Sequence, residues 1–311
     1  MNEILNFVYC FDENYIKQAE TSIISLLDSV DEKINILIIY TKQELDFSDK
    51  ILNHRHLNNL QVYEFKDNSL NFPNIEVGHV SIATYFRFFI SDYFQDFKYL
   101  IYLDTDIVAI NNPIPALKET ISKFKTSKFT ICAVEEHPYS DDVDEFKRLS
   151  IKSSYFNAGV LIIDFEHWNQ NKIGKELIKH METIRTSIKF WDQDVMNSYF
   201  DGKYVKISKN LNYSTSTNIF FKEKYKEIMD DVIFLHFSGK IKPWSIKGTD
   251  SKVSEFYHRN YRKISSNSYH LVPRNKKLDI SNLISIIIYF KFAKLDKKIK
   301  FLKEALYTIF K

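Results

Sequence analysis

Apolar residues fall in short continuous runs along most of the chain, and polar or helix-spaced segments separate these runs. Seven runs predict buried strands, at residues 5–11, 34–40, 60–65, 99–103, 129–134, 158–165 and 232–235. The first run is rich in aromatic side chains, and the fourth ends directly on two acidic residues. The pattern therefore predicts a sheet whose strands are mostly buried on both faces.

Helical spacing appears between the runs. Asp12, Glu13 and Asn14 supply helix-start chemistry, and apolar or small residues then recur at 15, 16, 19, 23, 26 and 27. Further helices are expected near 48–57 and over 80–93, whereas the polar, aperiodic stretch 209–226 predicts a loop. Strands that alternate with helices predict an α/β fold, doubly wound, with a mostly parallel sheet covered by helices.

The end of the chain has a different pattern. Residues 280–292 are mostly apolar, and residues 293–311 place apolar side chains at 295, 299, 302, 306 and 309 among many lysines. An apolar stripe opposite a basic face is typical of a helix that lies on an anionic lipid surface. A helix packed on the rest of the protein, or on a partner, would give the same pattern.

The end of the chain also differs from the rest in net charge. From residue 274 onward, ten basic residues face three acidic ones, a net of +7, which leaves −4 for residues 1–273 out of the total of +3. The sequence predicts two parts: a catalytic domain over residues 1–265, and a basic amphipathic membrane-association segment over residues 266–311. An acidic body without a basic groove pattern argues against nucleic acid as a partner.

Composition adds three limits. Of 311 residues, 44% are apolar, so the chain can bury a core without covalent links. Cys10 and Cys132 both lie in apolar runs and are expected to be buried thiols in a reducing cytosol. No signal peptide or membrane-spanning stretch is expected, so the predicted location is the cytoplasm.

The most informative polar residues are Asp104 and Asp106, which follow the strand 99–103. Ligands of open α/β sheets gather at the carboxyl ends of strands. Two carboxylates one residue apart there can bind one Mg²⁺ or Mn²⁺, which can in turn hold a diphosphate. The pair alone is weak, because aspartates at strand ends also form ordinary turns.

The segment 236–244 (HFSGKIKPW) contains residues that could bind a metal or a phosphate together with the acidic pair. His236 follows an apolar run and can offer a nitrogen to a metal, which favours Mn²⁺ over Mg²⁺. Gly239 permits close approach of the backbone to a phosphate, and Lys242 provides a mobile positive charge. Taken alone, His236 would more simply be a core histidine beside a polar loop.

Six segments together resemble a known family. They occur in this order: FDENY at 11–15, HVSIATYFR at 79–87, LDTD at 103–106, YFNAGVL at 155–161, DQD at 192–194, and 236–244. They look like family 8 glycosyltransferases, in particular the bacterial lipopolysaccharide and lipooligosaccharide α-galactosyltransferase group. The similarity covers about residues 4–245. It implies a single nucleotide-binding domain of the GT-A type, a UDP-hexose donor, Mn²⁺ and retention of anomeric configuration.

The resemblance also implies roles for individual residues. Asp104, Asp106 and His236 would bind the metal, and Gln193 would lie at the reacting face of the donor sugar, with Asp192 as an alternative nucleophile. The residues that would bind the UDP-sugar and its metal are Asp12, Asn14, Tyr15, Arg87, Asp104, Thr105, Asp106, Asn157, Ala158, Asp192, Gln193, His236, Gly239 and Lys242. Among these, Tyr15 would stack on uracil, and Gly239 and Lys242 would receive the diphosphate.

Plainer roles remain open for several of these residues. Asp12 and Asn14 could only cap the first helix, and Arg87 could pair with Asp92 on a helix surface. Asn157 could satisfy a turn, and Asp192 or Asp194 could start a helix. For His79, as for Arg87, a functional role and a structural role remain equally open.

The proposed reaction is hexosyl transfer from UDP-galactose or UDP-glucose to a saccharide hydroxyl, with a lipid-borne acceptor at the inner face of the cytoplasmic membrane. Three alternatives remain. They are a metal-dependent nucleotide-sugar hydrolase, a non-catalytic protein that binds glycans or lipid surfaces, and a self-glucosylating enzyme of the glycogenin kind, for which nineteen tyrosines are available.

Overall fold

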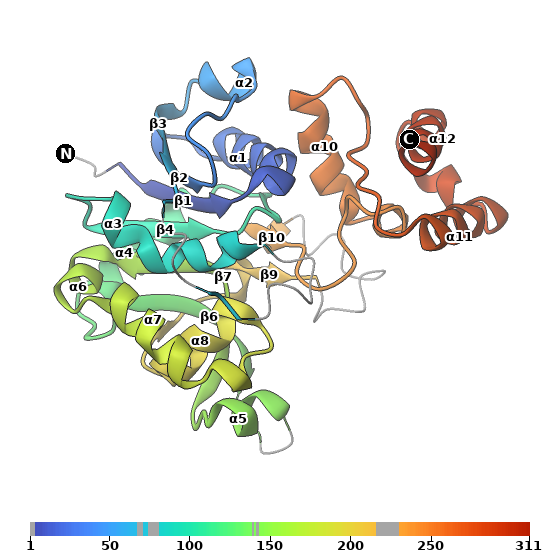
Figure 1. Cartoon of the computed structure of the whole chain (residues 1–311). Helices are drawn as coiled ribbons and strands as arrows, with labels where there is room; N and C mark the ends of the chain where they lie inside the picture. Colours follow the sequence, from blue (N-terminus) through green and yellow to red (C-terminus); the bar gives the residue numbers. More distant parts are fainter. Residues whose placement is uncertain (1–3, 67–70, 74–80, 139, 141–142, 216–229) are drawn as a thin grey trace.

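The computed structural model describes residues 4–66, 71–73, 81–138, 140, 143–215 and 230–311. Two sheets organise the protein (Figure 1). The larger sheet has the order β3-β2-β1-β4-β7-β6-β8, and the smaller has the order β5-β10-β9. The strands are β1 (Asn6–Phe11), β2 (Ile34–Tyr40), β3 (Leu57–Glu64), β4 (Tyr99–Leu103), β5 (Ile107–Ala109), β6 (Ile131–Pro138), β7 (Ser154–Asp164), β8 (Val205–Lys206), β9 (Tyr213–Ser214) and β10 (Phe234–His236).

All seven predicted strands form, and the large sheet is mostly parallel, as expected, with β6 and β8 also pairing in parallel. β3, β2, β1 and β4 pair in parallel. β7 runs antiparallel to both of its neighbours, β4 and β6. The prediction placed 232–235 among the buried strands; β10 is buried, but it belongs to the small sheet, where it pairs with β5 and β9.

Helices cover both faces of the large sheet, as predicted. Side chains of α1, α2 and α4 pack on one face, and those of α3, α6, α7 and α8 pack on the other, together with the 3-10 helix η3. Their bounds are α1 (Ile16–Ser29), α2 (Asp49–Leu52), η3 (Ile82–Phe89), α3 (Ile90–Tyr93), α4 (Ile114–Phe124), α6 (Phe165–Gln170), α7 (Ile173–Thr183) and α8 (Trp191–Phe200). The short α5 (Asp144–Leu149) and 3-10 helix η1 (Glu13–Tyr15) complete this part.

Two helix predictions differ from the structure in type and length. The predicted helix at 48–57 is one turn, α2, because the chain must turn at 53–56 to enter β3. The predicted helix at 80–93 is mostly the 3-10 helix η3, which begins at Ile82 after the Ser81 cap. The predicted loop at 209–226 contains the 3-10 turn Lys209–Leu211 and the strand β9, and residues 216–226 lie outside the described residues.

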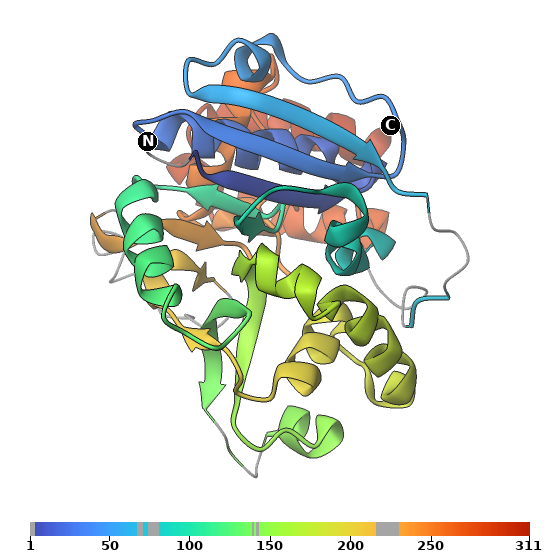
Figure 2. The same cartoon turned by 90° about the vertical axis from the view of Figure 1, so that its left-hand side faces the viewer.

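Three helices follow the small sheet. They are α10 (Ser254–Ile264), α11 (Lys276–Ile288) and α12 (Lys298–Phe310). α10 packs against α1, whereas α11 and α12 stand beyond α10, on the side of the molecule away from the N terminus (Figure 1). Figure 2 shows the large sheet from another side, with the C-terminal helices behind it.

The C-terminal helices share a small core with Ile246 and Tyr269. Phe301, Ala305 and Ile309 of α12 are buried with Leu283 and Ile286 of α11. Of the predicted apolar stripe, Ile309 is buried in this core and Leu295 and Leu302 pack against it, whereas Ile299 and Leu306 are exposed. None of the helices within the described ranges is both long and apolar enough to cross a bilayer.

Candidate active site

Asp104, Asp106 and His236 converge where the two sheets meet. Asp104 and Asp106 lie between β4 and β5, and His236 is the last residue of β10. The antiparallel pairing of β10 with β5 sets His236 opposite Ile107, so the imidazole is next to the acidic pair. The potential ligand atoms of the three side chains all lie within 4.8 Å of one another.

The geometry suits a divalent cation. His236 Nε2 lies 3.2 Å from Asp106 Oδ1 and 3.9 Å from Asp104 Oδ2. Two carboxylates and one imidazole are a donor set for Mn²⁺ or Mg²⁺, with the nitrogen favouring the softer ion. Among the described residues this is the one group of three or more acidic, histidine or cysteine side chains with such spacing.

Lys242 bonds directly to this cluster. Its Nζ donates to Asp106 Oδ2 at 2.5 Å and to the Phe237 carbonyl at 2.9 Å. Burial opposes the charge on Asp106, but Lys242 and His236 hold the pKa of that carboxyl well below its usual range. Burial likewise works against a charged His236, yet Asp106 and Asp104 raise its pKa above the usual value. Attraction between Asp106 and Lys242 thus favours the carboxylate form of Asp106.

Arg87 links the acidic pair to α8. Its guanidinium lies 2.7 Å from Asp104 Oδ1 and 3.0 Å from Asp192 Oδ2, and it donates to the Ala158 carbonyl and the Tyr102 hydroxyl. Burial opposes its charge, but Asp192, Tyr102 and Asp104 raise the pKa of Arg87 above its usual value. The alternative pairing of Arg87 with Asp92 is therefore wrong.

Asp192 is almost completely buried. Its Oδ1 accepts a hydrogen bond from the Thr84 hydroxyl, while Oδ2 faces Arg87. Burial raises the pKa of Asp192 to about 6, although Arg87 acts in the opposite direction. Asp194 has the plainer role: it accepts the Lys189 and Phe190 amides before α8 and pairs with Arg148.

Gln193 is held by both ends of its amide. Its Oε1 accepts from the Ala158 amide at 3.0 Å, and its Nε2 lies 3.3 Å from Glu136 Oε2 and from the Tyr155 hydroxyl. Ala158 therefore contributes only backbone groups, its N–H to Gln193 and its carbonyl to Arg87. Glu136, which sequence reasoning missed, is a partly exposed carboxylate beside Gln193.

Residues 12–15 lie near the cluster, and the plainer capping role is seen for Asp12. Asp12 caps η1, because its side chain accepts from the Asn14 amide at 2.9 Å. Asn14 is exposed, and Tyr15 packs edge-on against Trp244 with 6.4 Å between ring centroids. Burial and the nearby Asp106 and Asp12 carboxylates raise the pKa of Tyr15, so its hydroxyl stays neutral.

Asn157 lies behind the cluster, on the side of His236. It is buried with Asn212, whose side chain bonds to both Asn157 and His236. The turn role considered for Asn157 is partly correct, because its Oδ1 accepts the Gly159 amide. Asn212 was not predicted, because it follows the loop-like segment 209–211 and no spacing rule marks it.

The remaining predicted residues differ in burial and in their distance along the chain from the acidic pair. Thr105 is buried between the two aspartates. Gly239 is exposed, and its φ of +81° explains why this turn carries glycine. Tyr102 was missed, although it donates to Asp104 Oδ1 at 2.8 Å; the period of two along β4 puts both on one face. His79 lies outside the described residues.

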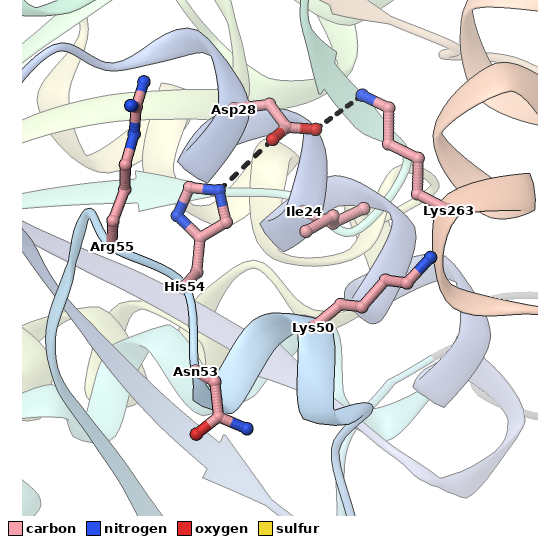
Figure 3. Close-up of a pocket in the computed structure, with 7 residues that line it drawn as sticks. All are labelled: Ile24, Asp28, Lys50, Asn53, His54, Arg55 and Lys263. Atoms are coloured by element: carbon pink, nitrogen blue, oxygen red, sulfur yellow. Dashed lines mark hydrogen bonds and ion pairs between the residues drawn. The ribbon is translucent and has the colours of Figure 1, made fainter.

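A separate pocket lies between α1, α2 and α10 (Figure 3). Asp28 lies at its centre and pairs with His54 at 3.2 Å and with Lys263 at 2.5 Å. Lys50 and Arg55 also line it. It shares no residue with the Asp104–Asp106–His236 cluster, so it does not extend the candidate active site.

Comparisons with known proteins agree on one family. The model of the family described as Glycosyl transferase family 8 matches residues 6–248. General stress protein A of Bacillus subtilis (strain 168) is 24% identical over 279 residues, which cover 83% of this chain and 93% of that protein. The lipopolysaccharide 1,3-galactosyltransferase of Salmonella typhimurium (strain LT2) is 28% identical over 272 residues, which cover 81% and 76%.

Among solved structures, the galactosyltransferase LgtC in complex with donor and acceptor sugar analogues superposes with a TM-score of 0.65 at 20% identity. The superposition covers 84% of this chain and 97% of that chain. The likeness shows that the two share a fold, with the mixed α/β architecture described above.

Proposed function

This chain belongs to glycosyl transferase family 8, and on that premise we propose that it transfers galactose or glucose from a UDP-sugar to a hydroxyl of a saccharide acceptor, with retention of configuration. The observation that carries the proposal is the convergence of Asp104, Asp106 and His236 on one point, with Lys242 beside it. A transferase that expels a nucleoside diphosphate needs positive charge at that place.

The donor set supports Mn²⁺ as the cofactor, with Mg²⁺ as the alternative. When bound, the cation would neutralise the charge that develops on the departing diphosphate. Asp104, Asp106 and His236 would hold it. Lys242, whose ammonium is on a flexible stem, would exchange Asp106 for the diphosphate, and Gly239 would let the backbone approach that group.

For the nucleoside, the proposal assigns Tyr15 to the uracil ring and Asp12 and Asn14 to polar contacts. Tyr15 is half-buried beside Trp244 and stays neutral, as a stacking platform requires. Thr105, Asn157 and Ala158 would line the donor, and Arg87 would act mainly by holding Asp104 and Asp192 in place.

Retention needs either a nucleophile on the far face of the sugar or attack from the side of the leaving group. The environment of Asp192 supports the second, because its side chain is 6% exposed and is held between Arg87 and Thr84. Gln193 is a neutral amide, its oxygen is already bonded to the Ala158 amide, and it is a poor nucleophile. We therefore assign Gln193 to orienting the sugar, and a diphosphate oxygen to receiving the acceptor proton.

The acceptor is proposed to be lipid-linked, as in lipopolysaccharide or another surface glycan, because relatives named for lipopolysaccharide galactosyl and glucosyl transfer match most of this chain. Residues 266–311 would hold the enzyme on the inner face of the cytoplasmic membrane. Their apolar side chains are exposed at Ile288, Tyr289 and Phe290, next to many lysines, which supports this assignment. Nucleic acid is not a proposed partner.

The test is UDP release with Mn²⁺ from UDP-galactose and UDP-glucose, with and without a galactoside acceptor, beside Asp104→Ala. Release that needs the metal and Asp104 and rises sharply with acceptor is expected, and the preferred donor names the sugar. Release indifferent to acceptor would favour a hydrolase. Sugar incorporated into the protein itself would favour self-glucosylation, and no donor binding would favour a non-catalytic binding protein.

A further inference from the structure

A chain of buried hydrogen bonds ends on the side of His236 that faces away from the acidic pair. The Gly159 amide donates to Asn157 Oδ1 at 3.0 Å, Asn212 Nδ2 donates to the same oxygen at 2.8 Å, and Asn212 Oδ1 lies 2.9 Å from His236 Nδ1. Asn157, Asn212 and His236 are each at most 6% exposed. These contacts are thus shielded from competing water.

The Gly159 amide fixes which group donates and which accepts in each of these hydrogen bonds. A backbone N–H can only donate, so the atom of Asn157 that faces Gly159 is its oxygen. That oxygen can only accept, so Asn212 must turn its NH₂ group toward it. The Asn212 oxygen then faces His236, and Nδ1 of the imidazole must carry the proton that this oxygen accepts.

The other nitrogen of His236 points at the acidic pair. Nε2 lies 3.2 Å from Asp106 Oδ1, opposite the Nδ1–H that Asn212 holds. In a neutral imidazole with a proton on Nδ1, the lone pair is on Nε2. The ring also has little room to move, since a Cβ on Gly159 would lie 2.4 Å from His236 Cε1.

We infer that Asn212, oriented by Asn157 and the Gly159 amide, is a positioning residue that holds His236 in the Nδ1–H tautomer and so makes Nε2 the metal-binding atom. This inference rests on the proposed metal role of His236. Partners of this kind behind a metal ligand raise metal affinity by fixing the tautomer and ring orientation of the ligand. Asn157 then acts on the metal from behind His236, in addition to any contact with the donor.

The direct test measures Mn²⁺ affinity without turnover, by titrating the purified full-length protein with Mn²⁺ and following the paramagnetic resonance signal of the free ion. Asn212→Leu is expected to weaken binding about 10- to 100-fold. Asn210→Leu, the same change two residues away and outside this hydrogen-bond chain, should leave the affinity unchanged. Asn212→Asp should restore much of it, because a carboxylate oxygen still accepts from Nδ1–H.

Asn157 gives a second, independent test. Asn157→Asp keeps the oxygen that accepts from Gly159 and Asn212, so Mn²⁺ affinity should stay near that of the unchanged protein. Asn157→Leu removes that oxygen and should weaken Mn²⁺ binding as Asn212→Leu does. If Asn157 also touches the donor through its NH₂ group, the Asp variant raises the KM for the UDP-sugar without changing Mn²⁺ affinity.

Pulsed paramagnetic resonance of bound Mn²⁺ adds a signature that a merely structural role would not move. The coupling from a histidine nitrogen should be present in the unchanged protein and in Asn212→Asp, and weakened in Asn212→Leu. Should Asn212→Leu not fold, Asn212→Ser, which shortens the side chain without adding bulk, takes its place.

The outcomes separate the two levels of the proposal. Equal Mn²⁺ affinity and equal nitrogen coupling in the unchanged protein and a folded Asn212→Leu would overturn the inference and leave the metal site intact. Failure of the unchanged protein to bind Mn²⁺ at all would overturn the proposed metal site, and the inference with it.

Discussion

The candidate active site buries side chains that can carry charge, whereas the C-terminal helices expose large apolar side chains. At the site, the titratable residues Arg87, Asp106 and Asp192 are each at most 9% exposed. In α11 and α12 and the turn between them, large apolar side chains are open to solvent, with Ile288 62% and Phe290 71% exposed. Soluble proteins normally place these classes of side chain the other way round.

The two regions differ in whether the fold itself supplies partners for these side chains. Every buried charge at the site has its counter-charge within the fold, as Arg87 has in Asp104 and Asp192. The exposed apolar side chains of the C-terminal helices are not covered within the described structure, and the same segment is rich in lysine. The charges of the first region are paired within the fold, whereas the second leaves large apolar side chains in solvent, and we propose that the membrane covers them.

The largest expected effect concerns the site alone. Asp106→Asn keeps the shape of the side chain but removes the charge that faces His236 and Lys242. Loss of a metal contact worth several kcal/mol should lower metal-dependent UDP release by about 10³-fold or more. Binding to anionic vesicles should not change. A variant that keeps more than a tenth of its activity would contradict the metal site.

The reverse experiment changes the C-terminal helices alone. Ile288→Asp combined with Phe290→Asp removes two exposed apolar side chains and adds repulsion from anionic lipid, so partition to phosphatidylglycerol vesicles should fall roughly 100-fold. UDP release with a soluble acceptor should stay unchanged, as measured in the same preparations. The matched control is Leu52→Asp, an exposed apolar position on α2. Equal loss in the control would refute a membrane role for 266–311.

A smaller effect tests how closely the site is packed. Gly159→Ala adds one methyl group where His236 Cε1 would be 2.4 Å away, so the imidazole must turn. Mn²⁺ affinity should drop by about tenfold or more, with the protein still folded by circular dichroism. Gly202→Ala, next to Ser153 and outside the site, is the control for the cost of an added methyl group. Unchanged Mn²⁺ affinity would mean that the ring adapts.

The smallest effect is on stability and its pH dependence. The folded state raises the pKa of Asp192 to about 6, so between pH 4 and 6 the folded chain holds a proton that the unfolded chain releases. The unchanged protein should therefore lose stability relative to Asp192→Asn as pH rises through this window. The difference is on the order of 2 kcal/mol, a few degrees in Tm by scanning calorimetry. A constant difference across pH 4–7 would show that Asp192 is already ionised at low pH.

Much of the molecule could be predicted because its signals are local. Continuous apolar runs identified all seven strands, since a strand covered on both faces must be apolar throughout. The acidic pair stood out because it ends such a run; the segment 236–244 offered His236 and Lys242, and the resemblance then implied roles for them. The structure places these side chains together, as Lys242 on Asp106 illustrates.

The unpredicted features depend on contacts that no local pattern encodes. The reversed direction of β7 arises from long-range pairing, and its apolar run would look the same in either direction. Asn212 directly precedes the two-residue strand β9, and the pairing of β9 with β10 brings Asn212 next to His236. Packing against Tyr269 and α11 determines which side chains of α12 are buried. Phe301 and Ala305 are buried there, whereas Ile299 and Leu306 are exposed.

The short ladder between β5 and β10 has a consequence for ions of different radius. Ile107 pairs with His236, and the Phe237 amide donates to the Asp106 carbonyl at 3.0 Å. The backbones that carry Asp106 and His236 therefore cannot separate without breaking this ladder. Asp104 lies outside it, with 29% of its side chain exposed. In the proposed metal site, adjustment to a smaller or larger cation would therefore fall to Asp104, and through it to Arg87.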